Sequence, residues 1–282
     1  MKRNCHHLLL TAWLAVTFAA SAGAEDATET RRSELLKQMR DLAEQTEVAY
    51  ESGAKAPELK PNPVFRYDDQ PRRFIDATMW VWLDQGRPVA FQKIEAKYRG
   101  GTGAPEWGYC FGSVSPELLS VHWPGGESFR STAPGIAFRP LPNAPPIAQS
   151  EVGRRRQLRE LARQFSSRIV TDPNNNVTRE TRLLTTPILV YSDEKTQAPG
   201  AVFGFAANNV NPDVLLLLEA RDDAGELRWH FAPARMTSSG VTLRFGETVV
   251  WEVSWVNWDE APFPTWTFFY TPRTPLAEEA SP

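Results

Sequence analysis

Cysteine and histidine, which can pair as a catalytic nucleophile and its base, are few in this sequence. Beyond the first 24 residues these two residue types occur only as Cys110, His122 and His230. Cys110 and His122 stand in neighbouring apolar segments, 107–114 and 118–123, and a hairpin of the two would bring thiol and imidazole together as covalent catalysis requires. Cys110 lies between two aromatic residues, however, and a buried cysteine is usually an unreactive apolar side chain. We therefore expect no catalytic residue and keep a Cys110–His122 pair as the alternative.

Carboxylates are the second set of candidates for chemistry. Two of them flanking a glycosidic bond can hydrolyse it, which makes a hydrolase the rival to a non-catalytic protein. Glu95 and Glu219 each follow an apolar segment and precede an alanine and a basic residue. Because an acid and a base need different environments, this likeness favours a structural role for both. The remaining pairs are Asp68–Asp69 and Asp222–Asp223, beside turn residues where Asp is common.

Metal, cofactor and nucleic-acid chemistry find little support. The sequence has no Cys or His pair at the short spacing of a zinc site, so we expect no metal ligand. The glycine-rich run Gly100–Gly103 lacks the Lys-Ser/Thr of a phosphate-binding loop, and we expect no cofactor. With 31 Lys and Arg against 34 Asp and Glu, the net charge of −3 predicts no nucleic-acid partner.

Tryptophan is the most unusual feature of the composition, with 10 residues. Trp80 and Trp82 are two positions apart, and Trp251 and Trp255 continue the same alternation through Val253, so in strands each set faces one side. A row of this kind either stacks on sugar rings or packs in a core. We take Trp80, Trp82, Trp251 and Trp255 as candidate ligand-binding residues, with core packing as the alternative.

The elements that must position these residues follow one plan twice. Residues 31–50 and residues 158–169 have the apolar spacing of amphipathic helices, and Ser150 is a suitable N-cap for the second. Each is followed by short apolar segments separated by turn residues, which is typical of an antiparallel meander. We predict an α+β fold of two similar units, each one helix packed on an antiparallel β meander.

A direct comparison of the two halves supports an internal repeat. At an offset of 124 positions, residues 63–96 align with 187–220 without a gap. A shared hydrophobic pattern would explain apolar matches but not polar identities in one register. These identities include Tyr67/Tyr191, Asp69/Asp193, Pro88/Pro212 and Glu95/Glu219. In this register Trp80–Leu83 should match Gly204–Ala207.

The N-terminus predicts export. Lys2 and Arg3 precede the apolar run Leu8–Ala20, and Ala22-Gly23-Ala24 is a small-residue cleavage motif, as in a secretory signal peptide. The run is too short to span a bilayer, and no membrane span is expected after signal cleavage. We therefore expect a secreted or periplasmic protein. The predicted division is a signal peptide at 1–24, a first unit at 25–140, a proline-rich linker at 141–150, a second unit at 151–271 and a disordered tail at 272–282.

Four segments, ATMWVWLDQGRPVA, RLLTTPILVY, NPDVLLLLEAR and LRWHFAPARMTSSGVTLRF, resemble a set of uncharacterised secreted bacterial proteins. The resemblance implies bacterial export and no particular activity. We expect an exported non-catalytic binding or scaffold protein of the cell envelope or extracellular space, with a small molecule, a glycan or a protein as its partner. The alternative is a cell-envelope hydrolase that uses paired carboxylates or Cys110–His122.

Overall fold

Strands dominate the structure, a computed structural model that describes residues 29–97, 105–175, 177–257, 260 and 263–271. These residues form eighteen strands, and two α-helices lie at 29–44 and Glu151–Ala162 (α2). The fold is mostly β, with 50% strand and 14% helix, so the expected α+β fold with a helix on each meander is wrong. None of the described helices is long and apolar enough to cross a membrane.

Both helices end earlier than the sequence predicted. Residues four positions apart face the same side in a helix and also in a strand, so their spacing does not distinguish the two. The second expected helix ends at Ala162, and β10 (Phe165–Asp172) follows it. Phe165 and Ile169 are buried there by strand alternation. The first expected helix likewise stops at residue 44, and its last residues form β1 (Glu47–Tyr50).

The first half of the chain, joined by one strand from the far end, builds a six-stranded and a three-stranded antiparallel sheet. The larger has the order β18 (Trp266–Thr271), β6 (Glu106–Ser113), β5 (Arg87–Lys97), β4 (Phe74–Asp84) and β2 (Glu58–Leu59), with β3 (Phe65–Asp69) also paired to β4. The smaller has the order β1, β7 (Leu119–His122) and β8 (Ser128–Arg130). A short 3-10 helix, η1 (Gln70–Arg72), connects β3 to β4.

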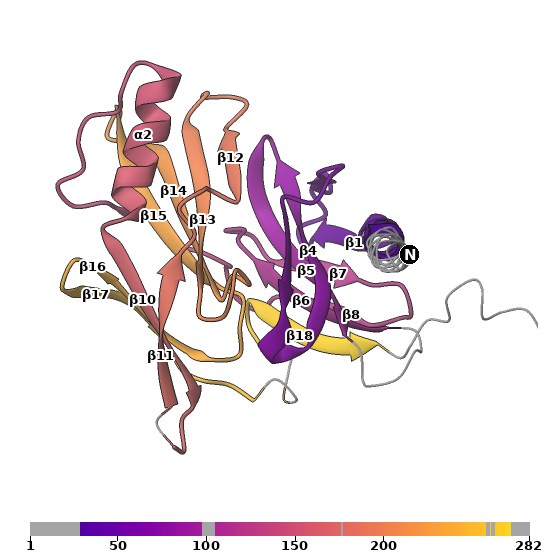
Figure 1. Cartoon of the computed structure of the whole chain (residues 1–282). Helices are drawn as coiled ribbons and strands as arrows, with labels where there is room; N and C mark the ends of the chain where they lie inside the picture. Colours follow the sequence, from indigo (N-terminus) through magenta and orange to yellow (C-terminus); the bar gives the residue numbers. More distant parts are fainter. Residues whose placement is uncertain (1–28, 98–104, 176, 258–259, 261–262, 272–282) are drawn as a thin grey trace, which may run out of the picture.

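The second half forms one nine-stranded antiparallel sheet. Its order is β17 (Thr248–Val253), β16 (Gly240–Phe245), β10, β11 (Val177–Leu183), β13 (Pro199–Ala206), β14 (Val214–Asp223), β15 (Glu226–Arg235) and β9 (Arg139–Pro140), with β12 (Leu189–Ser192) also paired to β13. Figure 1 shows the two large sheets side by side, with α2 on the outer side of one and the N-terminal helix on the outer side of the other.

Three apolar cores hold these layers together. The helix at 29–44 contributes Met39 to the core of the first half, and α2 contributes Leu161 to that of the second. A third core lies between the halves, where Phe91 of β5 joins Leu215 of β14. Each large sheet thus buries one face within its own half and the other against its neighbour, so the halves share a continuous apolar interface.

The strand pairings of the two halves correspond. In each, four residues lie in line across neighbouring strands: Tyr67, Ala77, Glu95 and Gly108 in the first half, and Tyr191, Gly200, Glu219 and His230 in the second. The pairing differs from the gapless alignment by one residue in β4, because Trp80 pairs opposite Gln92 as Phe203 pairs opposite Leu216. Trp80 therefore corresponds to Phe203, and not to Gly204 as we expected.

Two strands exchange places between the halves. β18, the last described strand, pairs Tyr270 with Gly108 of β6, and β9 pairs Pro140 with His230 of β15 at the corresponding position. β18 therefore completes the first sheet from the opposite end of the chain (Figure 1). The domain division stays a prediction, and its ranges 1–24 and 272–282 lie outside the described residues.

A pair of glycines tests the contact between the halves. Gly86, in the β4–β5 turn, has a φ of 79°, and a Cβ there would lie 2.3 Å from the backbone oxygen of Ser192. Gly225, in the β14–β15 turn, has a φ of 89° but no atom within 4 Å of such a Cβ. We expect Gly225→Ala to lower the free energy of unfolding by about 1 kcal/mol and Gly86→Ala by about 2–4 kcal/mol, because the second also forces backbone atoms apart. Urea unfolding measures both, and equal losses would mean that this turn does not contact β12.

Candidate ligand-binding site between the two halves

A buried tyrosine–glutamate hydrogen bond occurs once in each half. The Tyr67 hydroxyl donates to Glu95 Oε1 at 2.7 Å, and the Tyr191 hydroxyl donates to Glu219 Oε2 at 2.9 Å. Burial, with the adjoining carboxylate, raises the pKa of both tyrosines well above its ordinary value. In each half one strand lies between the tyrosine and its glutamate, and the tyrosine side chain crosses over that strand at Ala77 or Gly200. Only a small residue fits under the ring, since a Cβ on Gly200 would lie 2.3 Å from the Tyr191 ring.

Each half also sends a polar side chain into the acidic cluster of the other. Asn211 Nδ2 donates to Asp69 Oδ2 at 2.9 Å and to Glu95 Oε1 at 3.4 Å. The residue at the corresponding position is Arg87, whose guanidinium lies 3.3 Å from Asp193 Oδ2 and 3.0 Å from Glu219 Oε1. Because a buried carboxylate is stable only with donors around it, these contacts tie the two halves together in both directions.

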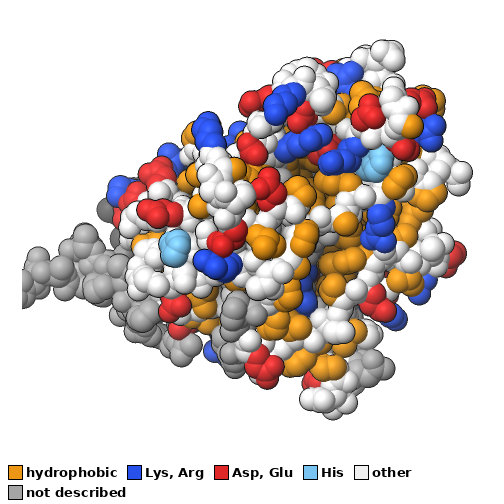
Figure 2. Space-filling model, turned by 180° about the vertical axis from the view of Figure 1, so that it is seen from behind, with side chains coloured by type: hydrophobic (Ala, Val, Ile, Leu, Met, Phe, Trp, Pro, Cys, Tyr) orange, Lys and Arg blue, Asp and Glu red, His pale blue; other side chains and the backbone are white. Residues whose placement is uncertain are grey.

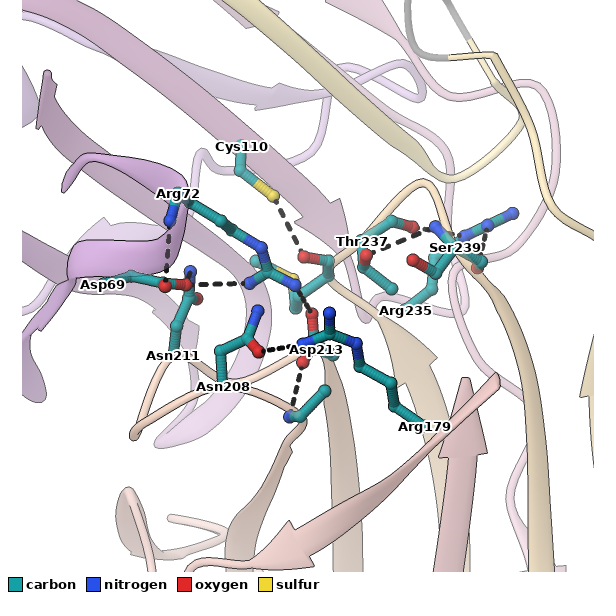
Figure 3. Close-up of polar contacts among 12 residues, drawn as sticks. Asp69, Arg72, Cys110, Arg179, Asn208, Asn211, Asp213, Arg235, Thr237 and Ser239 are labelled. Carbon is teal, nitrogen blue, oxygen red and sulfur yellow. Dashed lines mark hydrogen bonds and ion pairs between the residues drawn. The ribbon is translucent and has the colours of Figure 1, made fainter. Parts of the chain in front are cut away.

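Further charges complete the cluster of the first half. Arg72 Nη1 lies 3.1 Å from Asp69 Oδ2 and its Nη2 lies 2.7 Å from Asp213 Oδ1, so one guanidinium joins carboxylates of both halves (Figure 3). The buried Lys93 ammonium donates to Asn211 Oδ1 at 2.8 Å and to the Met236 carbonyl at 3.0 Å. Burial still raises the pKa of Glu95, because desolvation outweighs the nearby cations.

A cavity adjoins each cluster. The smaller, of about 280 Å³, lies beside Glu95, and the larger, of about 440 Å³, beside Glu219. Nine wall positions of the two cavities correspond. They are Lys93, Glu95, Lys97, Asn211, Met236–Ser238, Trp266 and Phe268 in the smaller, and Leu217, Glu219, Arg221, Arg87, Val114–Pro116, Ile136 and Phe138 in the larger. Viewed from behind, the molecule is hollowed along a band of hydrophobic side chains bordered by charged ones (Figure 2).

The two cavities differ in charge. Arg72, Lys93 and Lys97 line the smaller with one carboxylate, Glu95. Four carboxylates line the larger with two arginines: Asp84, Glu117, Asp193 and Glu219 with Arg87 and Arg221. His230 also lines the larger cavity, whereas its counterpart in the first half, Gly108, has no side chain. The same architecture therefore surrounds two chemically different spaces.

The four tryptophans expected to bind a ligand do not form one surface. Trp80 and Trp82 are 0% and 2% exposed in the core of the first half, and Trp80 Nε1 donates to Thr78 Oγ1 at 2.8 Å. Trp251 is partly buried against the core of the second half, and Trp255 is exposed after β17. Period-two spacing indicated a common face but not whether that face meets solvent.

The residues of the catalytic alternative are also separated. Cys110 on β6 pairs with Lys93 and Phe268, whereas His122 lies on β7 of the small sheet, opposite Glu47 and Ser128. Glu95 and Glu219 line different cavities. Within the described residues, no group of three or more His, Cys, Asp or Glu side chains is suited to hold a metal ion.

Sequence reasoning missed the residues that cross between the halves. Arg87 and Asn211 stand in corresponding turns, each directly before a proline of the aligned pair Pro88/Pro212. That recurring turn was the available signal. Nothing local distinguishes Asp84 or Glu117, since acidic residues beside turns are common.

Comparison with known proteins adds no assignment: no protein family, no curated protein and no solved structure matches this chain. The site must therefore be interpreted from its own geometry.

Cys110 should be unreactive in the folded protein. Its Sγ accepts a hydrogen bond from Trp266 Nε1 at 3.1 Å, and burial raises its thiol pKa to about 11. At neutral pH the thiolate that reacts with disulfide reagents is scarce. We expect negligible labelling by Ellman's reagent in native buffer and one equivalent after unfolding, with no change in His122→Ala. Rapid native labelling that His122→Ala abolishes would instead support the catalytic pair.

Glu95 should impose a pH dependence on stability. A carboxyl whose pKa is raised by folding binds more protons in the folded than in the unfolded chain, so stability falls as pH rises above its ordinary value of 4.5. The free energy of unfolding of the wild type should therefore fall relative to that of Glu95→Gln, by at most about 1.4 kcal/mol per pH unit. Urea titrations between acidic and neutral pH measure this difference. The exposed variant Glu247→Gln is the control and should follow the wild type, and a constant gap for Glu95→Gln would contradict the prediction.

Proposed function

We propose that this chain is an exported, non-catalytic binding protein of the bacterial cell envelope or extracellular space, and that the larger cavity holds its ligand. The observation that carries the proposal is the joint construction of that cavity. Asp84 and Arg87 of the first half and Tyr191 and Glu219 of the second line one space of about 440 Å³, within the range of small-molecule sites.

Several contacts favour binding over catalysis in this cavity. Glu219 is held by the Tyr191 hydroxyl, by Arg87 at 3.0 Å and by Arg221 at 2.9 Å. A carboxylate with three such partners has little freedom to exchange a proton with a substrate, which general acid–base catalysis requires. Such fixed groups suit a rigid wall that orients a ligand.

The proposal of export rests on the N-terminal pattern. Lys2, Arg3, the apolar run Leu8–Ala20 and the Ala22-Gly23-Ala24 motif together resemble a cleavable secretory signal. The proposal of an internal repeat rests on the corresponding pairings of β3–β6 and β12–β15 and on the matched cavity walls. On this view the protein carries two diverged copies of one pocket.

A plugged cavity tests the binding function. Ala137 is exposed and lines the larger cavity, so Ala137→Trp should obstruct it without disturbing the core. We expect saturation-transfer NMR against a mixed set of small sugars, amino acids, carboxylates and amines to detect binding to the wild type. That binding should be lost in Ala137→Trp.

Ser238→Trp is the matched control, because Ser238 lines the smaller cavity at the position corresponding to Pro116 in the larger. It should leave the NMR signals unchanged. Equal binding by wild type and Ala137→Trp, or no binding at all, would contradict the proposal. Turnover of glycoside or ester substrates that Glu219→Gln abolishes would establish the hydrolase alternative instead.

A further inference from the structure

We infer that the larger cavity binds a small molecule through a protonated amine. This inference rests on the proposed function and adds the chemical class of the ligand. Some charged and hydrogen-bonding groups of the cavity wall have partners within the protein, and others do not. The groups without such partners indicate the chemistry of the ligand.

The inner charges of the cavity satisfy one another. Arg87 contacts both Asp193 and Glu219, and Arg221 contacts Glu219 at 2.9 Å while its guanidinium lies 4.3 Å from the centre of the Phe138 ring. Two arginines thus balance two carboxylates. This inner part of the wall has no net charge for a ligand to neutralise.

The outer carboxylates are not balanced. Among the described residues, the side chain of Asp84 accepts from the Tyr50 hydroxyl alone, at 3.0 Å, and that of Glu117 from the Ser52 hydroxyl alone, at 3.0 Å. No Lys or Arg of the described chain lies within ion-pair distance of either carboxylate. Lys55 interacts with the charge of Asp84 from further away, but its ammonium forms an ion pair with Glu58 at 2.7 Å. Burial is the main cause of the raised pKa of Tyr50, and the charges of Asp84 and Glu117 raise it further. Both carboxylates therefore lie near the same tyrosine in the cavity wall.

His230 adds an acceptor to the same space. It is 8% exposed, and its Nδ1 lies 3.1 Å from the Arg228 carbonyl. Since a carbonyl can only accept, Nδ1 carries the hydrogen, and in this tautomer Nε2 is the ring nitrogen with a lone pair for a ligand. No protein partner reaches Nε2 among the residues described. Asp84, Glu117 and this Nε2 therefore present acceptors to the cavity, which suits a ligand rich in N–H donors.

The corresponding cavity has the opposite character. Leu217 in the larger cavity replaces Lys93 in the smaller, and Glu117 occupies the position that corresponds to the neutral residue Ser239. Apolar side chains also line the larger cavity, among them Val89 and Ile136. An ammonium group at the outer carboxylates, with an apolar or sugar-like body against this wall, fits both features.

Matched amine and hydroxyl compounds test the inference by isothermal titration calorimetry. Glucosamine is compared with glucose, and hexylamine with hexanol. We expect at least one amine to bind about tenfold or more tightly than its partner, because a charge-assisted hydrogen bond is the stronger one. The pair that shows the difference distinguishes an amino sugar from an alkylamine. Equal affinities within both pairs, or no binding of either amine, would overturn the inference.

Variants assign the effect to the outer carboxylates. Asp84→Asn combined with Glu117→Gln should weaken the amine about tenfold or more and leave the hydroxyl compound unaffected, whereas Glu247→Gln, remote from the cavity, should bind as the wild type. Both acids lie at partly or fully exposed positions, and circular dichroism checks that the variant is folded. Wild-type amine affinity in the folded double variant would overturn the inference. If only non-amine compounds bind and Ala137→Trp removes them, the binding function stands and the amine inference fails.

Discussion

Five buried carboxylates at the face between the two large sheets constrain the rest of this structure. Asp69 and Glu95 in one half, and Asp193, Asp213 and Glu219 in the other, are at most 4% exposed. A carboxylate in that position is stable only with donors around it, because the surrounding apolar core cannot solvate it. Each half supplies a tyrosine for its own cluster, and Asn211, Arg87 and Arg72 reach carboxylates of the opposite half. Separation of the halves would leave charges without partners on both sides, which makes the interface specific as well as apolar.

A cavity lies beside each cluster, one next to Glu95 and one next to Glu219. Once the anchoring contacts are satisfied, the remaining wall positions are free to differ. Lys93 against Leu217 and Gly108 against His230 change charge and hydrogen bonding without altering the strand pairings. One architecture therefore encloses two chemically different cavities.

The exchange of end strands closes the first sheet with a distant part of the chain. β18 contributes Trp266 and Phe268 to the wall of the smaller cavity, as residues 136–138 contribute to the larger. The first half therefore depends on the far end of the chain both for its sheet edge and for its cavity. This dependence couples the folding of the halves more closely than a linker between separate domains would.

The sequence by itself determined the main strands, the recurrence of Tyr67, Asp69 and Glu95 as Tyr191, Asp193 and Glu219, and the expectation that Cys110 is buried. These features are local: alternation reports burial, and turn residues report strand ends. The sequence predicted too much helix, because the four-residue spacing of Phe165 and Ile169 fits both the period of a helix and the period of a strand. Only the tertiary structure decided that Trp80 and Trp82 face a core, that β18 joins β6, and that Arg87 and Asn211 reach across to the opposite cluster. Periodicity shows which side chains are buried but not which other surface covers them, because contacts between distant segments depend on how whole sheets pack.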